Sequence, residues 1–110
     1  MPEKVHVMKF PFIDHEVEIL IEEKLLKYLK EISRDDLFEA LNYIIKELSS
    51  NANKANLKRI HFRRKGLDIN NKEHYSIGVK DFSKEINEKS ELYFNLAKEM
   101  GFFVKIEMYI

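Results

Sequence analysis

Apolar residues recur every three or four positions across residues 37–55, and this spacing is the strongest constraint on the fold. It places the side chains along one face of an α-helix of about five turns. Ser33 and Asp36 stand before the run with the spacing of a helix N-cap, so we predict a helix over about residues 34–55. Its predicted buried stripe consists of Leu37, Leu41, Ile44, Leu48, Ala52 and Ala55.

The remaining segments predict two further helices and three strands. The same helical spacing covers residues 15–32 and 81–100, and Gly101 is placed to cap the second of these helices. Period-two alternation and β-forming residues predict strands over residues 5–12, 57–62 and 102–110. Residues 68–78 are polar and irregular, which predicts a loop.

The predicted order is strand, helix, helix, strand, helix, strand, which favours an α+β fold. The expected architecture is a two-layer α/β sandwich with the helices packed on one face of a mixed or antiparallel sheet. A length of 110 residues suits a single domain over residues 1–110. The predicted strand at 102–110 has a free backbone edge, so we expect either a missing C-terminal half or a partner chain to pair with it.

Composition excludes several classes of function. The 19 basic and 19 acidic residues cancel, so no positive field favours nucleic acid, and the basic run at residues 58–65 is expected to be a solvated strand face. The lack of cysteine excludes disulfides and thiolate sites. No apolar run approaches the roughly 18 residues of a membrane span, so we expect a cytoplasmic protein without a membrane partner. His6, His61 and His74 lack metal-site spacing and are expected at the surface.

Three polar residues on the helix predicted at 34–55 point to metal–nucleotide chemistry. Glu47 and Asn51 are four positions apart and Lys54 is three further on, so they share one strip of the helix. An amide oxygen is a hard ligand for Mg²⁺, a lysine offsets phosphate charge, and a glutamate can orient water. The strip can therefore converge on one small ligand.

The segment from Glu47 to Asn56, ELSSNANKAN, resembles the N box of the histidine-kinase-like (GHKL) ATPases, a superfamily that includes sensor histidine kinases, Hsp90-type chaperones, DNA gyrase and MutL. The family pattern E-L-x-x-N-A-x-K is matched at every fixed position. The resemblance implies that Asn51 coordinates Mg²⁺ and helps bind ATP. It also implies that Glu47 is the catalytic base or water-orienting group and that Lys54 lies near the phosphates.

The chain departs from this family beyond the N box. The family also requires an Asp-x-Gly-x-Gly segment for the adenine and a glycine-rich lid for the phosphates, because only backbone without Cβ approaches the nucleotide so closely. This chain has three glycines, all isolated. The resemblance then implies that residues 63–101 are an insertion. The chain is either the N-terminal part of a longer ATPase or a shortened relative that has lost nucleotide binding.

Two functions follow. The first is the Mg-ATP-binding N-box portion of a histidine-kinase-like signalling protein, inactive as the isolated chain, in which kinase and simple ATPase activity cannot be told apart. The alternative is a non-enzymatic α/β interaction module that pairs with a partner chain through the strand at 102–110.

Overall fold

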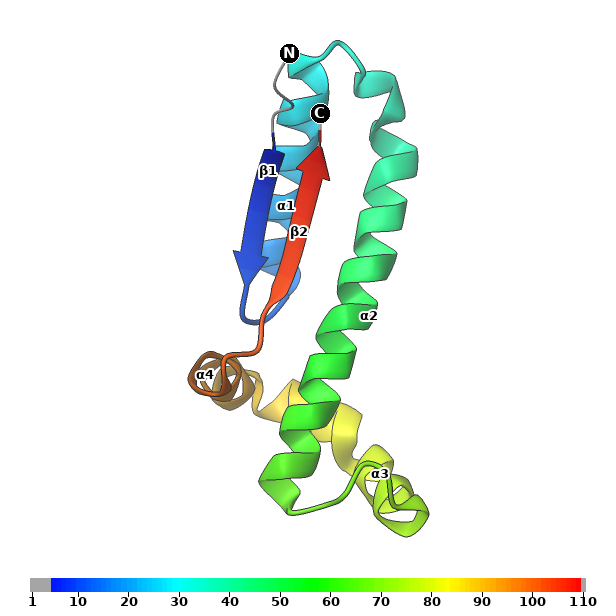
Figure 1. Cartoon of the computed structure of the whole chain (residues 1–110), viewed down its shortest axis with the longest axis vertical. Helices are drawn as coiled ribbons and strands as arrows, with labels where there is room; N and C mark the ends of the chain where they lie inside the picture. The colour runs from blue at the N-terminus through cyan, green and yellow to red at the C-terminus, as the bar shows by residue number, and fades with distance from the viewer. Residues whose placement is uncertain (1–4, 110) are drawn as a thin grey trace.

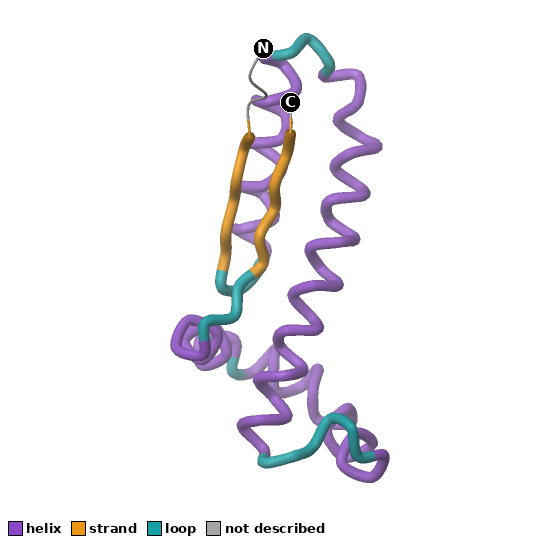
Figure 2. The backbone as a smooth tube through the Cα atoms, viewed as in Figure 1, coloured by secondary structure: helices purple, strands orange, loops and turns teal. Residues whose placement is uncertain are grey.

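The computed structural model describes residues 5–109, which form an elongated α+β molecule of 51 × 25 × 24 Å (Figure 1). Most of these residues are helical, as the tube in Figure 2 shows. The elements are β1 (Val5–Phe10), α1 (His15–Glu31), the short 3-10 helix η1 (Asp35–Leu37), α2 (Phe38–Lys65), α3 (Lys72–Glu88), α4 (Ser90–Met100) and β2 (Val104–Tyr109). No helix among residues 5–109 combines the length and apolarity needed to cross a bilayer.

β1 and β2 form a two-stranded antiparallel sheet that packs against α1. Met8 pairs with Ile106 and Phe10 with Val104, so alternate residues of both strands face α1. Met8, Val104, Ile13 and Ile21 form the centre of this apolar cluster. The strands predicted at 5–12 and 102–110 are confirmed with slightly shorter bounds, and Ile110 lies outside the described residues.

The strand predicted at residues 57–62 is wrong, because these residues continue α2. Leu57, Ile60 and His61 are all buried, and their spacing of three and four positions is helical. No proline or glycine occurs in residues 38–65, and Gly66 adopts a left-handed conformation with φ of 68° and ends the helix. The helix of 28 residues is therefore about 42 Å long.

The buried face of α2 also differs from the predicted one. Ser49, Asn53 and Leu57 are buried, whereas Ile44 and Leu48 of the predicted stripe are exposed. The apolar spacing indicated a helix correctly but did not indicate which face packs against the protein. An apolar strip of α2 is consequently open to solvent.

The prediction that Ser33 caps the next helix is wrong, because Ser33 ends α1. Ser33 adopts a left-handed conformation with φ of 56°, and the amide of Arg34 donates to the carbonyl of Leu29 at 2.8 Å. This is the hydrogen bond of a Schellman motif. α2 itself starts at Phe38, after η1 and without a side-chain cap. The N-terminus of α1 is capped by Asp14, whose Oδ1 accepts from the amide of Val17 at 2.8 Å.

The C-terminal half of α2 packs against α3 and α4 around a second apolar cluster. Leu57, Ile60, Tyr93 and Ala97 are its centre, together with Phe12 from the connection between β1 and α1. The loop predicted at 68–78 is partly wrong, because Asn71 accepts from the amides of Glu73 and His74 and begins α3. The helix predicted at 81–100 is divided at Lys89, and Gly101 ends α4 as predicted.

Candidate functional site

Glu47, Asn51 and Lys54 are all exposed on α2. Their spacing keeps them on one side of the helix. Ser49 and Asn53, which are two positions from Asn51 and therefore about 200° around the helix from it, are buried. Glu47 and Asn51 thus face away from the surface on which α2 rests, whereas Lys54 lies at the edge of that surface and lines a cleft there with Asn53 and Leu57.

Asn53 fixes this orientation of α2. Its Oδ1 accepts from the amide of Ile13 at 3.0 Å, and its Nδ2 donates to the carbonyl of the same residue at 3.2 Å. Both bonds are buried, so they are stronger than equivalent bonds in water. Asn53 occupies a variable position of the N-box pattern, so the pattern did not predict its structural role.

The fixed apolar residues of the pattern, Leu48 and Ala52, line an open groove beside β2. Leu48 remains 66% exposed. The groove has a volume of about 260 Å³ and is completed on the α2 side by Ile45 and Ser49. Its other wall is the consecutive run 104–108 of β2. Consecutive residues of a strand point to opposite faces of the sheet, so the groove follows the edge of β2 that does not pair with β1.

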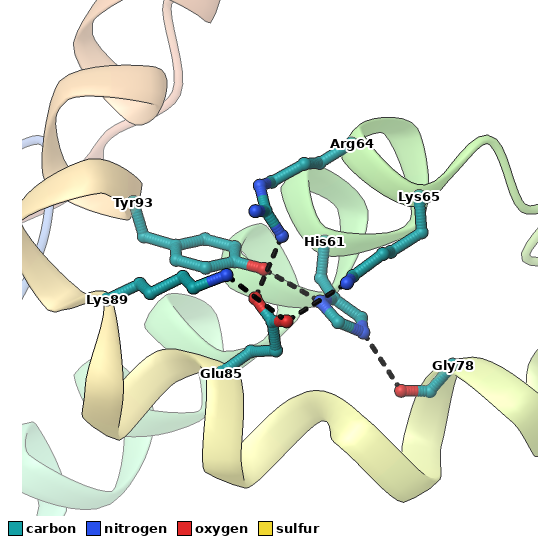
Figure 3. A network of polar contacts seen from close by, with 7 residues as sticks. All are labelled: His61, Arg64, Lys65, Gly78, Glu85, Lys89 and Tyr93. Carbon is teal, nitrogen blue, oxygen red and sulfur yellow. Dashed lines mark hydrogen bonds and ion pairs between the residues drawn. The ribbon is translucent and has the colours of Figure 1, made fainter.

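A buried histidine joins the C-terminal end of α2 to α3 and α4 (Figure 3). His61 is 0% exposed, which corrects its predicted position at the surface. Its Nε2 lies 3.0 Å from the carbonyl of Gly78, which can only accept, so Nε2 carries the proton. In the neutral ring Nδ1 then accepts from the Tyr93 hydroxyl at 2.7 Å. Burial, and secondarily the charge of Glu85, raise the pKa of Tyr93 and keep the hydroxyl protonated.

Glu85 lies at the edge of this cluster among three cations. Its carboxylate is 2.8 Å from Arg64, 2.9 Å from Lys65 and 3.7 Å from Lys89 (Figure 3). The hydrogen bond from Lys65 is the main cause that lowers the pKa of Glu85, and the nearby positive charges add to it. The group holds helices together and lies at the opposite end of α2 from Glu47.

The basic run at residues 58–65 forms the last turns of α2 and not a strand face. Besides Arg64 and Lys65, Arg63 lies 5.2 Å from the ring centre of Phe102 and Lys58 lies 5.9 Å from that of Tyr75. Cations in the last turn also interact favourably with the helix dipole. Most of these side chains therefore take part in packing within the chain.

The described residues contain no group of three or more histidine, aspartate or glutamate side chains that could hold a metal ion. A metal at Asn51 would consequently take most of its ligands from water and from a bound phosphate. Mg²⁺ is commonly held in this way, because it keeps several waters.

Comparison with known proteins places the segment within a longer relative. No family model and no solved structure matches the chain. An uncharacterized protein of Treponema pallidum (strain Nichols) is 37% identical over 98 residues, which are 89% of this chain and 19% of that protein. The chain therefore spans less than a fifth of the curated relative that it matches.

Proposed function

We propose that the chain supplies the N-box wall of a magnesium–nucleotide site in a longer protein of the histidine-kinase-like ATPase superfamily. In this proposal Asn51 is the Mg²⁺ ligand, Glu47 is the catalytic base or water-orienting group, and Lys54 lies beside the phosphates of ATP. The observation that carries it is the exposure of these three side chains on one strip of α2, while Asn53 anchors the opposite side.

The donor chemistry of the strip fits Mg²⁺ and a nucleotide. The exposed carboxamide of Asn51 offers a hard oxygen, and the exposed ammonium of Lys54 offers charge for a phosphate. When bound, the metal ion would neutralise charge on the phosphates. Glu47 is within one helical turn of Asn51, so it can orient a water molecule near the same ligand.

The remaining walls would come from other parts of the longer protein. Gly66 and Gly101 have positive φ and end helices, and Gly78 packs directly against the ring of Phe62. All three glycines of the chain therefore serve its own fold. The glycine-rich segments that hold adenine and phosphates in this superfamily must then lie outside the 110 residues.

The groove beside β2 supports the same proposal at the level of the fold. A further strand that pairs with the open edge of β2 would cover Leu48 and Ala52, the apolar residues of the N-box pattern. Further strands added beyond it would widen the sheet into the two-layer α/β sandwich expected from the sequence.

Calorimetry with Mg-ATP tests the proposal on the longer natural product that contains this segment. We expect the product to bind Mg-ATP, and Asn51→Ala to weaken binding about tenfold or more, as loss of a metal ligand should. Asn95→Ala is the matched control, because Asn95 is also an exposed helical asparagine but lies on α4. The assignment is wrong if the product ignores nucleotide, or if the two variants bind alike.

A second candidate function is a non-enzymatic interaction module, and the unpaired edge of β2 specifically favours it. β1 and β2 are the two strands of the described chain, so each has one free edge. An extended segment of a partner chain can add to the edge of β2 and place side chains in the groove.

Light scattering at rising protein concentration tests this second function on the 110 residues. We expect Leu48→Asp to reduce assembly, whereas Tyr43→Asp leaves it unchanged. The two side chains are equally exposed on α2, at 66% and 67%, but only Leu48 lines the groove. A wild-type chain that stays monomeric, or equal effects of the two variants, would count against pairing between copies.

A further inference from the structure

We infer that a cleft on the opposite flank of α2 from β2 binds a small organic anion that carries a ring, of the aromatic carboxylate type. The cleft has a volume of about 480 Å³, within the range of small-molecule sites. It lies where the connection between β1 and α1 meets α2, α3 and the start of α4. Neither Glu47 nor Asn51 lines this cleft, and Lys54 is the residue that it shares with the strip of the proposed function. The inference goes beyond that function.

One side of the cleft is apolar and is firmly held. Phe12, Leu57, Phe82 and Ile86 line it, and all four belong to the second apolar cluster. Asn53 also lines the cleft, and its paired bonds to Ile13 fix the connection against α2. A ligand ring can therefore be covered by a surface that is already formed in the free protein.

The other side of the cleft carries one free cation and several neutral polar groups. The ion pairs among residues 5–109 use the ammonium groups of Lys46, Lys65, Lys89 and Lys105 and leave that of Lys54 unused. Ser50, Ser83 and Asn87 add two hydroxyl groups and an amide to the lining of the same cleft. These are groups that bind a carboxylate.

Asp14 is the carboxylate that lines this cleft, and one of its oxygens already accepts a hydrogen bond within the chain. Its Oδ1 caps α1 by accepting from the amide of Val17, at a helix N-terminus that favours negative charge. Lys54 thus selects for an anionic ligand, and the volume limits the ligand to one or two rings.

Three probes with the same ring, similar size and different charge test the inference: phenylacetate, 2-phenylethanol and 2-phenylethylamine. Each is added to the ¹⁵N-labelled 110-residue protein, and amide shifts are followed by NMR. We expect phenylacetate to shift amides around the cleft with saturation, and to bind about fivefold tighter than the alcohol, the effect of one exposed charge pair. The amine should bind more weakly than the alcohol.

Two variants, each with a matched control, separate this site from the rest of the surface. Lys54→Met should abolish the preference for phenylacetate over the alcohol, whereas Lys80→Met, at an exposed lysine of α3, should keep it. Ser83→Trp should fill the cleft and abolish binding of all three probes. Ser76→Trp, at an exposed serine one heptad earlier on α3, should not.

The inference is overturned by shifts that do not saturate, by shifts centred on the groove beside β2, or by affinity independent of probe charge. It is equally overturned if Ser83→Trp binds as the wild type does. Asn51→Ala distinguishes the two proposals, since it should weaken Mg-ATP binding by the longer product and leave phenylacetate binding unchanged.

Discussion

Two asparagines of the ELSSNANKAN segment have opposite environments. Asn51 is exposed, whereas Asn53 is buried and makes both of its hydrogen bonds to Ile13. The motif predicts a metal-ligand role for Asn51, and that role stays a prediction. The sequence did not predict the structural role of Asn53, because its partner lies 40 residues away.

Asn53→Ala should lower the free energy of unfolding by about 1–3 kcal/mol, because it leaves the buried amide and carbonyl of Ile13 without partners. Asn51→Ala should change it by less than about 0.5 kcal/mol, as expected at an exposed site. Urea denaturation followed by circular dichroism measures both. A loss for Asn53→Ala no larger than that for Asn51→Ala would show that the two bonds to Ile13 add little to stability.

His61 shows the same limit of sequence reasoning. Its partners Tyr93 and Gly78 are 32 and 17 residues away, on two different helices. A lone histidine without carboxylates at metal-site spacing is usually a surface residue, and only the packing of α3 and α4 on α2 makes it a buried one. If residues 57–62 had been predicted as a helix, His61 would have fallen on the same face as Leu57 and Ile60. That position would have indicated that His61 is buried.

At the scale of elements, α2 is where prediction from the sequence was both strongest and most incomplete. Its existence followed from apolar spacing, but its length did not. Ile60 and Phe62 alternate as in a strand and are also compatible with a helix, and short runs of this kind are ambiguous. Phe62 is buried because α3 packs over it, and that contact was invisible from the local pattern.

The crossing of α2 and α3 depends on the absence of a side chain at Gly78. A Cβ atom added there would lie 2.5 Å from the ring of Phe62. Gly78→Ala should therefore destabilise the protein by about 1–3 kcal/mol, although alanine favours helices. Ser76→Ala, at an exposed position of the same helix, should be neutral or slightly stabilising. The change in thermal unfolding midpoint measures this, and a more stable Gly78→Ala protein would contradict the close approach.

At the scale of the whole molecule, α2 is shared by two apolar clusters. Ile45 packs against the cluster of β1, β2 and α1, and Leu57 and Ile60 are centres of the cluster with α4. Figure 1 shows α2 running from the level of the sheet to that of α3 and α4. The sequence predicted both terminal strands and the α+β class. It did not predict that one helix packs in both clusters, since this depends on the continuation of α2 through residues 57–65.

We expect the shared helix to make unfolding cooperative. Leu57→Ala should cost about 2–5 kcal/mol by leaving a cavity among α2 and α4. Native-state hydrogen exchange should then show the same loss of protection for amides in β2 as for amides in α4. Leu48→Ala, at an exposed position, is the control and should change neither. If amides lost protection in α4 alone, the two apolar clusters would unfold separately.

The pairing of β1 with β2 also determines where the polypeptide enters and leaves the fold. Val5 is the cross-strand partner of Tyr109, and paired backbones of this kind lie about 5 Å apart. A turn of a few residues is therefore enough to connect Tyr109 to Val5. If the chain is then opened between α2 and α3, the result is a circular permutant with every helix and strand intact. The same geometry lets a surface loop of a host protein carry the whole segment, with two attachment points no farther apart than neighbouring strands.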